Sequence, residues 1–345
     1  MKSFVTVLTA VLLMGAAIPA QADDAKNAAC DAVAASPRDT TKPAGVEGVS
    51  FGDVDSAKAR PICEAAAAAD PTNVRIVYQA GRSIDAGGKD LRAALVYYEK
   101  AASMGHVLAN YSVGNIFWND QDGIPRDSTI AAKYFTVAAN GGLDLSMEIL
   151  GRLYEMGKGV PQDYAQAKMW FDKGSALGEA DSMDDLGRLY DRGKGIPVDK
   201  NLATAWFKKS ADAGSSEGMS DYGISLQFGQ GVTKNLSEAA RYYRMGADGG
   251  SGYGKINLAR TMFDGDLMPK DQAGGYAIFV EAVRDSRNGL YRDIVEERAE
   301  HFVSEVQIKS IEAMLKWKGL FNGTPDESFD DESYAAITKI HDTKM

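Results

Sequence analysis

The chain has few of the residues from which catalytic and metal sites are usually built. Its 345 residues include only three histidines and two cysteines, and neither His-Glu-x-x-His nor Cys-x-x-Cys occurs. It also lacks a Ser-x-x-Lys motif. We therefore expect no enzyme activity, no metal and no cofactor.

Runs of basic residues are absent too. The sequence has 38 basic and 48 acidic residues and a formal net charge of −10. Proteins that bind nucleic acid usually present a basic face, so this composition argues against a nucleic-acid partner.

Only the N-terminus has a long apolar run. Lys2 precedes the apolar stretch 4–17, and Ala20-Gln21-Ala22 has the small-x-small form of a cleavage site. The stretch is too short to span a bilayer comfortably. We expect a signal peptide at residues 1–22, cleaved after Ala22, and a periplasmic or secreted protein that does not span the membrane.

The two cysteines, Cys30 and Cys63, both lie in the predicted mature chain. In an oxidising compartment such a pair most simply forms one disulfide. The alternatives are a metal-binding pair and two separate buried thiols. Residues 23–69 contain two alanine-rich helical stretches, which the disulfide would clamp into a helical N-terminal cap.

A 36-residue period runs through the middle of the chain. Leu-Gly-Arg-Leu-Tyr at residues 150–154 returns at residues 186–190, and Gly-Lys-Gly at 157–159 returns at 193–195. A unit of this length cannot bury its own apolar face, so the units must stack into a solenoid.

Two kinds of residue recur once in each of six units. An aromatic residue in the second helix is expected to fill the space between stacked helix pairs. A small residue in the first helix implies close helix approach, with alanines near the end of the second helix as the matching contact. The aromatic positions are Tyr98, Phe135, Phe171, Phe207, Tyr243 and Phe279; the small ones are Gly81, Gly114, Gly151, Gly187, Gly223 and Ala259.

Gly-x-Gly pairs separate the two predicted helices of three units. They begin at Gly157, Gly193 and Gly229, and we expect positive φ at these glycines. Asp163 and Asp199 follow where a carboxylate suits the start of a helix. No predicted strand precedes the glycines, so they do not form a phosphate-binding loop.

These elements resemble the Sel1-like repeat, a relative of the tetratricopeptide repeat, over residues 107–251. The unit at 70–106 lacks the Gly-x-Gly insertion and looks like a plain tetratricopeptide unit, and the unit at 252–289 looks degraded. The resemblance implies an all-α fold: a right-handed α/α superhelical solenoid of about six helix hairpins over residues 70–289, with N- and C-terminal helical caps.

Residues 290–345 resemble a peptidoglycan-binding-like domain. The spacing of Leu315, Gly319, Gly323, Asp326 and Phe329 carries this resemblance. It makes Asp326 and Phe329 candidate contacts to glycan or peptidoglycan. Glutamate and aspartate replace two glycines of the pattern, at positions 327 and 330, and the alternative is a small helical C-terminal cap.

In tetratricopeptide-type units the residue after the small position points into the concave groove, which makes this column a candidate partner-binding groove. Its arginines could grip carboxylates or backbone carbonyls of an extended partner. The alternative is local pairing of Arg152 with Glu155 and of Arg188 with Asp191. The column consists of Arg82, Asn115, Arg152, Arg188, Ile224 and Arg260, with apolar contacts added by Trp118, Phe228 and Phe263.

Two further motifs are interpreted as structural. The sequence Gly-Ser-Ser-Glu-Gly at 214–218 fits Gly-x-Ser-x-Gly, but it falls on a predicted turn between repeats. Asp184 and Asp185 are expected on a solvated helix surface. Replacing Arg152 and Arg188 by alanine is expected to weaken partner binding and leave stability nearly intact.

The expected function is a non-catalytic periplasmic scaffold for protein–protein interactions. The family resemblance implies an adaptor or regulator of an envelope complex or of a sensor kinase. One alternative is a peptidoglycan-associated protein that docks through its C-terminal module. Another is a hydrolase of the penicillin-interacting type.

Overall fold

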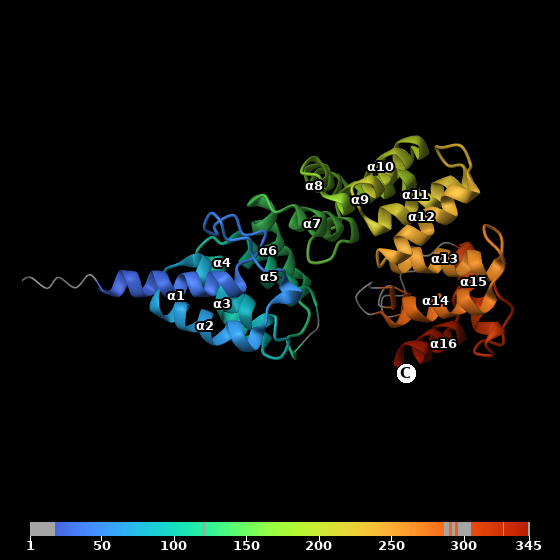
Figure 1. The fold of residues 1–345 in the computed structure, drawn as a ribbon. Helices are drawn as coiled ribbons and strands as arrows, with labels where there is room; N and C mark the ends of the chain where they lie inside the picture. Colours follow the sequence, from blue (N-terminus) through green and yellow to red (C-terminus); the bar gives the residue numbers. More distant parts are fainter. Residues whose placement is uncertain are drawn as a thin grey trace, which may run out of the picture. The chain divides into compact units, whose positions relative to one another are not determined.

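The computed structural model describes residues 18–119, 122–285, 290–291, 294–295, 305–326 and 328–343. Sixteen α-helices and no β-strand occur in these residues (Figure 1). The predicted all-α helical-repeat solenoid is therefore confirmed. None of the helices within these ranges is long and apolar enough to cross a bilayer.

The chain divides into two compact units, Met1–Leu143 and Asp144–Met345. This division was not expected from the sequence, because the 36-residue period continues across residue 143. Most of the predicted signal peptide, residues 1–17, lies outside the described residues. The predicted cleavage position after Ala22 falls within the bounds of the first helix.

The first unit combines an N-terminal cap with two repeat hairpins. The hairpins pair α3 with α4 and α5 with α6, while α1 and α2 pack on each other and on α3. The helices are α1 Ile18–Ala34, α2 Ser56–Ala69, α3 Val74–Asp85, α4 Leu91–Ser103, α5 Val107–Trp118 and α6 Ser128–Asn140.

The cap is fastened to the first repeat by covalent and polar contacts. Cys30 of α1 and Cys63 of α2 form a disulfide, and both residues are fully buried. Asp31 accepts hydrogen bonds from Arg75 (Nε, 3.0 Å) and from Gln79 (Nε2, 2.8 Å), both on α3. The helices α1 and α2 of the N-terminal segment thus pack on α3 of the first repeat.

We predict that replacing both cysteines by serine lowers the free energy of unfolding by about 2–4 kcal/mol, because the disulfide closes a long loop in the unfolded chain. Denaturant unfolding of the purified mature protein measures the change. Adding a reductant to the wild type should reproduce it and should leave the double variant unaffected. Equal stability of the two proteins under oxidising conditions would contradict a structural disulfide.

The second unit contains four hairpins and two C-terminal helices. Each second helix packs on the first helix of its own hairpin and on that of the next. The hairpin helices are α7 Asp144–Met156, α8 Tyr164–Ala176, α9 Ala180–Arg192, α10 Lys200–Asp212, α11 Ser216–Phe228, α12 Leu236–Asp248, α13 Gly252–Asp264 and α14 Gln272–Arg284, followed by α15 Glu305–Trp317 and α16 Asp331–Asp342.

Local chemistry explains where the second helices begin. Asp163 and Asp199 accept hydrogen bonds from backbone N–H groups of the first turns of α8 and α10, as predicted. Such a cap contributes about 0.5–2 kcal/mol. The preceding Gly-x-Gly pairs have positive φ, for example 69° at Gly193 and 71° at Gly195, which also matches the prediction.

The glycine column packs against the aromatic column of the same hairpin. A Cβ atom placed on Gly114 would lie 2.8 Å from Cε1 of Phe135, and one on Gly187 would lie 2.5 Å from Cδ1 of Phe207. We expected the rings between stacked pairs and the alanines against the glycines. Instead, each ring fills the space that its hairpin's glycine leaves open, and this sets the close approach of the two helices.

The C-terminal helices share a core with the last hairpin. Ile311, Leu315 and Ile337 of α15 and α16 are buried with Ile256 and Phe279 of α13 and α14. Phe329 is 7% exposed and packs on Tyr334. The structure therefore places Phe329, a predicted glycan contact, in the core, and this end of the chain caps the repeats.

Candidate functional site

The arginines of the middle repeats connect successive first helices. Nε of Arg152 lies 2.7 Å from Oε1 of Glu148, one turn earlier on α7, and 2.8 Å from Oδ2 of Asp185 on α9. Each such arginine therefore bridges an acid of its own helix and an acid of the next repeat.

Arg188 repeats this arrangement 36 residues later. Its Nη2 lies 3.0 Å from Oδ2 of Asp184, and its Nε lies 2.7 Å from Oδ2 of Asp221 on α11. Glu217, also on α11, approaches Nη2 to 3.7 Å. Arg152 and Arg188 therefore form a ladder of ion pairs between successive repeats.

The predicted local partners of these arginines are wrong. Glu155 pairs with Lys194 at 2.9 Å, and Asp191 pairs with Lys200 at 2.7 Å. In a helix the i and i+3 positions only bring two side chains near each other. The arginines pair instead with the acid four residues earlier on their own helix and with an acid of the next first helix.

The remaining members of the column lie in different surroundings. Arg82 is 3% exposed and donates to the carbonyl oxygens of Ala34 and Val49. The N-terminal cap therefore covers the Arg82 side chain. Arg260, also 3% exposed, donates to Asp266 at 2.7 Å and to Gln227 at 3.0 Å. Asn115 is half-buried on α5. The column is not one continuous open groove.

Sequence reasoning missed the acidic residues that surround the arginines. Asp184 and Asp185, expected on a solvated surface, are 0% and 3% exposed. The missed signal was their 36-residue recurrence: Glu148 aligns with Asp184, and Asp185 aligns with Asp221. Acidic residues that recur with the same 36-residue spacing as a column of arginines indicate ion pairs between successive repeats.

Five carboxylates therefore surround two guanidinium groups, and we call this set the acidic cluster. Burial, with repulsion from Asp185 and other acids, raises the pKa of Glu148 to about 8 despite the nearby Arg152. Burial likewise raises the pKa of Asp184, Asp185 and Glu217. The cluster consists of Glu148, Asp184, Asp185, Glu217 and Asp221 with Arg152 and Arg188.

We predict that the protein becomes less stable as pH rises from about 4.5 to about 8. In this window folded Glu148 keeps a proton that the unfolded chain has lost, so the folded state binds more protons and stability falls with pH. One such proton gives a slope of at most about 1.4 kcal/mol per pH unit. Urea unfolding at several pH values measures the slope.

The matched variant is Glu148→Gln, which should flatten this slope because glutamine does not titrate. Asp184, Asp185 and Glu217 act in the same direction, so part of the slope should remain. If the free energy of unfolding of the wild type instead rises between about pH 4.5 and about pH 8, the acidic cluster is not protonated in the folded state.

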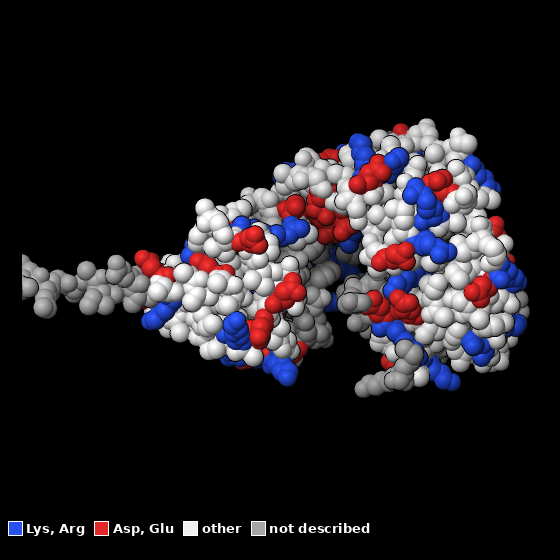
Figure 2. All heavy atoms as spheres, viewed as in Figure 1, with Lys and Arg blue, Asp and Glu red and all other residues white. Residues whose placement is uncertain are grey.

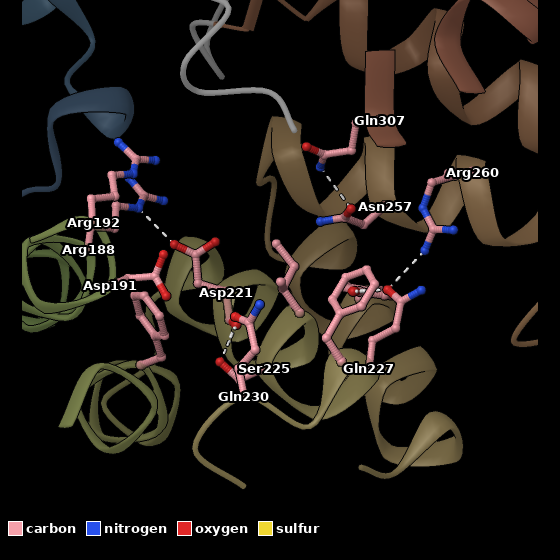
Figure 3. A pocket seen from close by; sticks show the side chains of 14 residues that line it. Arg188, Asp191, Arg192, Asp221, Ser225, Gln227, Gln230, Asn257, Arg260 and Gln307 are labelled. Atoms are coloured by element: carbon pink, nitrogen blue, oxygen red, sulfur yellow. Dashed lines mark hydrogen bonds and ion pairs between the residues drawn. The ribbon is translucent and has the colours of Figure 1, made fainter. Parts of the chain in front are cut away.

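A pocket of about 330 Å³ lies beside the acidic cluster in the second unit. Figure 3 shows Arg188, Asp191 and Asp221 on one side of it, and Asn257 with Gln307 on the other. Ten of its fourteen lining residues are polar or charged, and Phe228, which also lines it, is 53% exposed.

The Gly-x-Ser-x-Gly motif serves as a helix start. Oγ of Ser215 accepts a hydrogen bond from the backbone of Gly218 at the N-terminus of α11, and Oγ of Ser216 donates to the carbonyl of Gly249. Within the described ranges, no three His, Cys, Asp or Glu residues are arranged to hold a metal ion. The motif begins in the turn after α10 and continues into the first residues of α11.

The Sel1 repeat profile matches residues 77–106, 107–143, 145–179, 180–215 and 216–251, just over half of the chain. The chain belongs to the Sel1 repeat family. Residues 77–106, predicted to be a plain tetratricopeptide unit, are therefore a Sel1 repeat. The hairpin α13–α14 lies outside the matches.

Two solved structures share this fold. A Sel1 repeat protein from Oxalobacter formigenes is 22% identical with a TM-score of 0.59, and the match covers 66% of this chain and 92% of that one. The protective antigen c5321 of uropathogenic Escherichia coli is 19% identical with a TM-score of 0.53, over 83% of this chain and 64% of that one. No curated protein gave a match. Sel1 repeats generally act as protein–protein interaction scaffolds.

Proposed function

We propose that this protein is an exported, non-catalytic scaffold that binds a partner protein in the cell envelope through the first helices of its second unit. The observation that carries the proposal is the polar pocket bounded by α9, α11 and α13. Most of its lining side chains are polar or charged, and a packing surface between helices does not require such residues.

Export is supported by the N-terminal sequence and by the cysteine pair. Lys2, the apolar stretch 4–17 and Ala20-Gln21-Ala22 have the order of a signal peptide. The disulfide between Cys30 and Cys63 suits an oxidising compartment. Within the envelope the scaffold would act as an adaptor or regulator of a complex or of a sensor kinase.

Peptidoglycan docking receives no separate support from the C-terminal helices. Phe329 is a core residue, and the backbone N–H of Asp326 donates to Glu312 of α15. Phe329 thus belongs to the core shared with the last hairpin, and Asp326 is exposed and bound within the C-terminal segment itself.

Crosslinking in intact cells tests the scaffold proposal. An affinity-tagged chain should be recovered from the periplasmic fraction with Asp23 as its first residue, and mass spectrometry should identify the same crosslinked protein in repeated experiments. Cosedimentation with purified sacculi serves as the control for wall binding. Retention in the cytoplasm, or crosslinks to no recurrent protein, would refute the proposal.

A further inference from the structure

Hydrogen-bond donors predominate in the wall of the pocket between α9, α11, α13 and α15. The charged residues of its lining are three arginines and two aspartates, which gives the lining a formal charge of +1: Arg188, Arg192, Arg260, Asp191 and Asp221. A guanidinium group has five N–H donors and no acceptor. A wall of this composition suits a ligand that accepts hydrogen bonds.

The two aspartates of the wall already have cationic partners. Oδ1 of Asp191 lies 2.7 Å from Nζ of Lys200, and Oδ2 of Asp221 lies 2.7 Å from Nε of Arg188. A lysine or arginine of a ligand would have to displace one of these partners. The charges of the wall therefore do not favour a basic ligand.

A buried amide of the same wall has a donor without an acceptor. Asn257 of α13 is 2% exposed, and its Oδ1 accepts a hydrogen bond of 2.8 Å from Nε2 of Gln307. Its Nδ2 has no hydrogen-bond partner among the residues described. Figure 3 shows this nitrogen turned away from Gln307, toward the side of the pocket on which Arg188 and Arg192 lie. A buried donor without an acceptor is unfavourable, so an acceptor of a ligand would be stabilised there.

Acidic side chains gather over α7 and α9, as Figure 2 shows. Of the acidic cluster, Asp184 and Glu217 do not line the pocket. Burial raises the pKa of both carboxyl groups, which lowers the negative charge that they carry. These acids therefore repel a negatively charged ligand less than their number suggests.

Part of the wall is apolar. Phe228 is 53% exposed, and Ile224 lines the pocket from the same helix. An aliphatic side chain of a ligand would remove this surface from water. In an extended peptide, side chains two positions apart point to the same side. An acidic residue and an aliphatic residue with this spacing could therefore reach the polar and the apolar part of the wall together.

We infer that this pocket binds a carboxylate of an extended segment of the partner protein, with an aliphatic side chain of that segment against Phe228. Nδ2 of Asn257 donates to the carboxylate, and the guanidinium group of Arg192 attracts it from the opposite side of the pocket. A carboxylate is favoured over a backbone carbonyl because a hydrogen bond to an ionised group is about twice as strong as one between neutral groups. This inference rests on the proposed scaffold function.

Fluorescence anisotropy with labelled peptides tests the inference on the purified mature chain. The probe is a short peptide with an amidated C-terminus and with leucine and glutamate two positions apart. One comparison peptide has glutamine in place of glutamate. Another has the glutamine sequence with a free C-terminal carboxylate, so that the two peptides with a carboxylate distinguish a side-chain source from a terminal one.

We expect at least one of the two peptides with a carboxylate to bind about tenfold more tightly than the neutral amidated peptide. This advantage should shrink as salt rises, because ions screen the attraction. Equal affinity for all three peptides, or no binding of any, would show that the pocket does not select a carboxylate.

Two variants locate the binding site. Asn257→Asp keeps an oxygen that can accept from Gln307 and replaces the donor by a second oxygen, so the preference for a carboxylate should disappear. Arg192→Gln removes a positive charge from an exposed residue of the pocket lining and should weaken binding about tenfold. The control is Arg241→Gln, which removes the same charge from a side chain that is 54% exposed and lies outside the lining. Its affinity should match that of the wild type.

Thermal unfolding establishes whether Asn257→Asp is folded, and if it is not, the comparison of Arg192→Gln with Arg241→Gln decides. An equal loss of affinity in these two variants would show attraction to the overall surface charge and would overturn the inference. If envelope crosslinking still identifies a recurrent partner in such a case, the scaffold proposal stands and the carboxylate inference alone fails.

Discussion

Replacing Arg188 by alanine is expected to lower the free energy of unfolding of the second unit by about 3–5 kcal/mol. The guanidinium group lies within 3.0 Å of carboxylate oxygens of Asp184 and Asp221, and its side chain is 15% exposed. Without it, these acids remain close together with no compensating positive charge. Urea unfolding followed by circular dichroism measures the change.

This expectation reverses the sequence-based one, which held that Arg152 and Arg188 could be removed with little loss of stability. A surface arginine provides the control: Arg241 is 54% exposed and pairs only at the surface with Glu238, so Arg241→Ala should change stability by less than about 1 kcal/mol.

A compensating variant separates charge from packing. Adding Asp184→Asn and Asp221→Asn to Arg188→Ala removes the uncompensated carboxylates, so part of the lost stability should return. If Arg188→Ala unfolds at the same urea concentration as the wild type, the ladder between repeats contributes nothing to the fold.

Replacing Phe135 by alanine is also expected to lower the free energy of unfolding by about 3–5 kcal/mol, here in the first unit. The ring is fully buried and fills the space left by Gly114 on the paired helix. The truncated side chain would leave a cavity that two packed helices cannot close. Thermal and urea unfolding measure the loss.

The glycine gives a more specific test of the same contact. Gly114→Ala would normally favour a helix by about 1 kcal/mol, but the new Cβ would lie 2.8 Å from the ring, and overpacking costs about 1–3 kcal/mol. We therefore expect a net loss of stability. Val137→Ala on the same helix as Phe135 is the control, because Val137 is 49% exposed and should tolerate the change. A more stable Gly114→Ala protein would show that the helices do not approach closely there.

The repeat architecture was predictable because it depends on local pattern. The aromatic and glycine columns recur at a fixed spacing, and a helix places such residues on one face whatever surrounds it. The caps at Asp163 and Asp199 and the positive φ of the loop glycines were predictable for the same reason: each depends on a few neighbouring residues.

The partners of the arginines were less predictable. Arg152 has Glu148 and Glu155 on its own helix at suitable spacing, and only the stacking of α9 on α7 brings Asp185 to the guanidinium group. Arg82 was predicted to line a groove. Instead, it donates to the carbonyl oxygens of Ala34 and Val49 in the N-terminal segment. Contacts between residues more than thirty positions apart decide both cases.

The sequence alone determined that this chain forms helix hairpins, how long each repeat is and that the glycine and aromatic columns turn inward, because these depend on spacing within about one repeat. The tertiary structure alone decided the division at residue 143, the burial of Asp184 and Asp185, and the position of Asn257 beside Gln307. These features depend on which helices face each other, and the free energy of a charge or an amide depends on whatever lies within a few ångströms of it, wherever in the chain that neighbour is found.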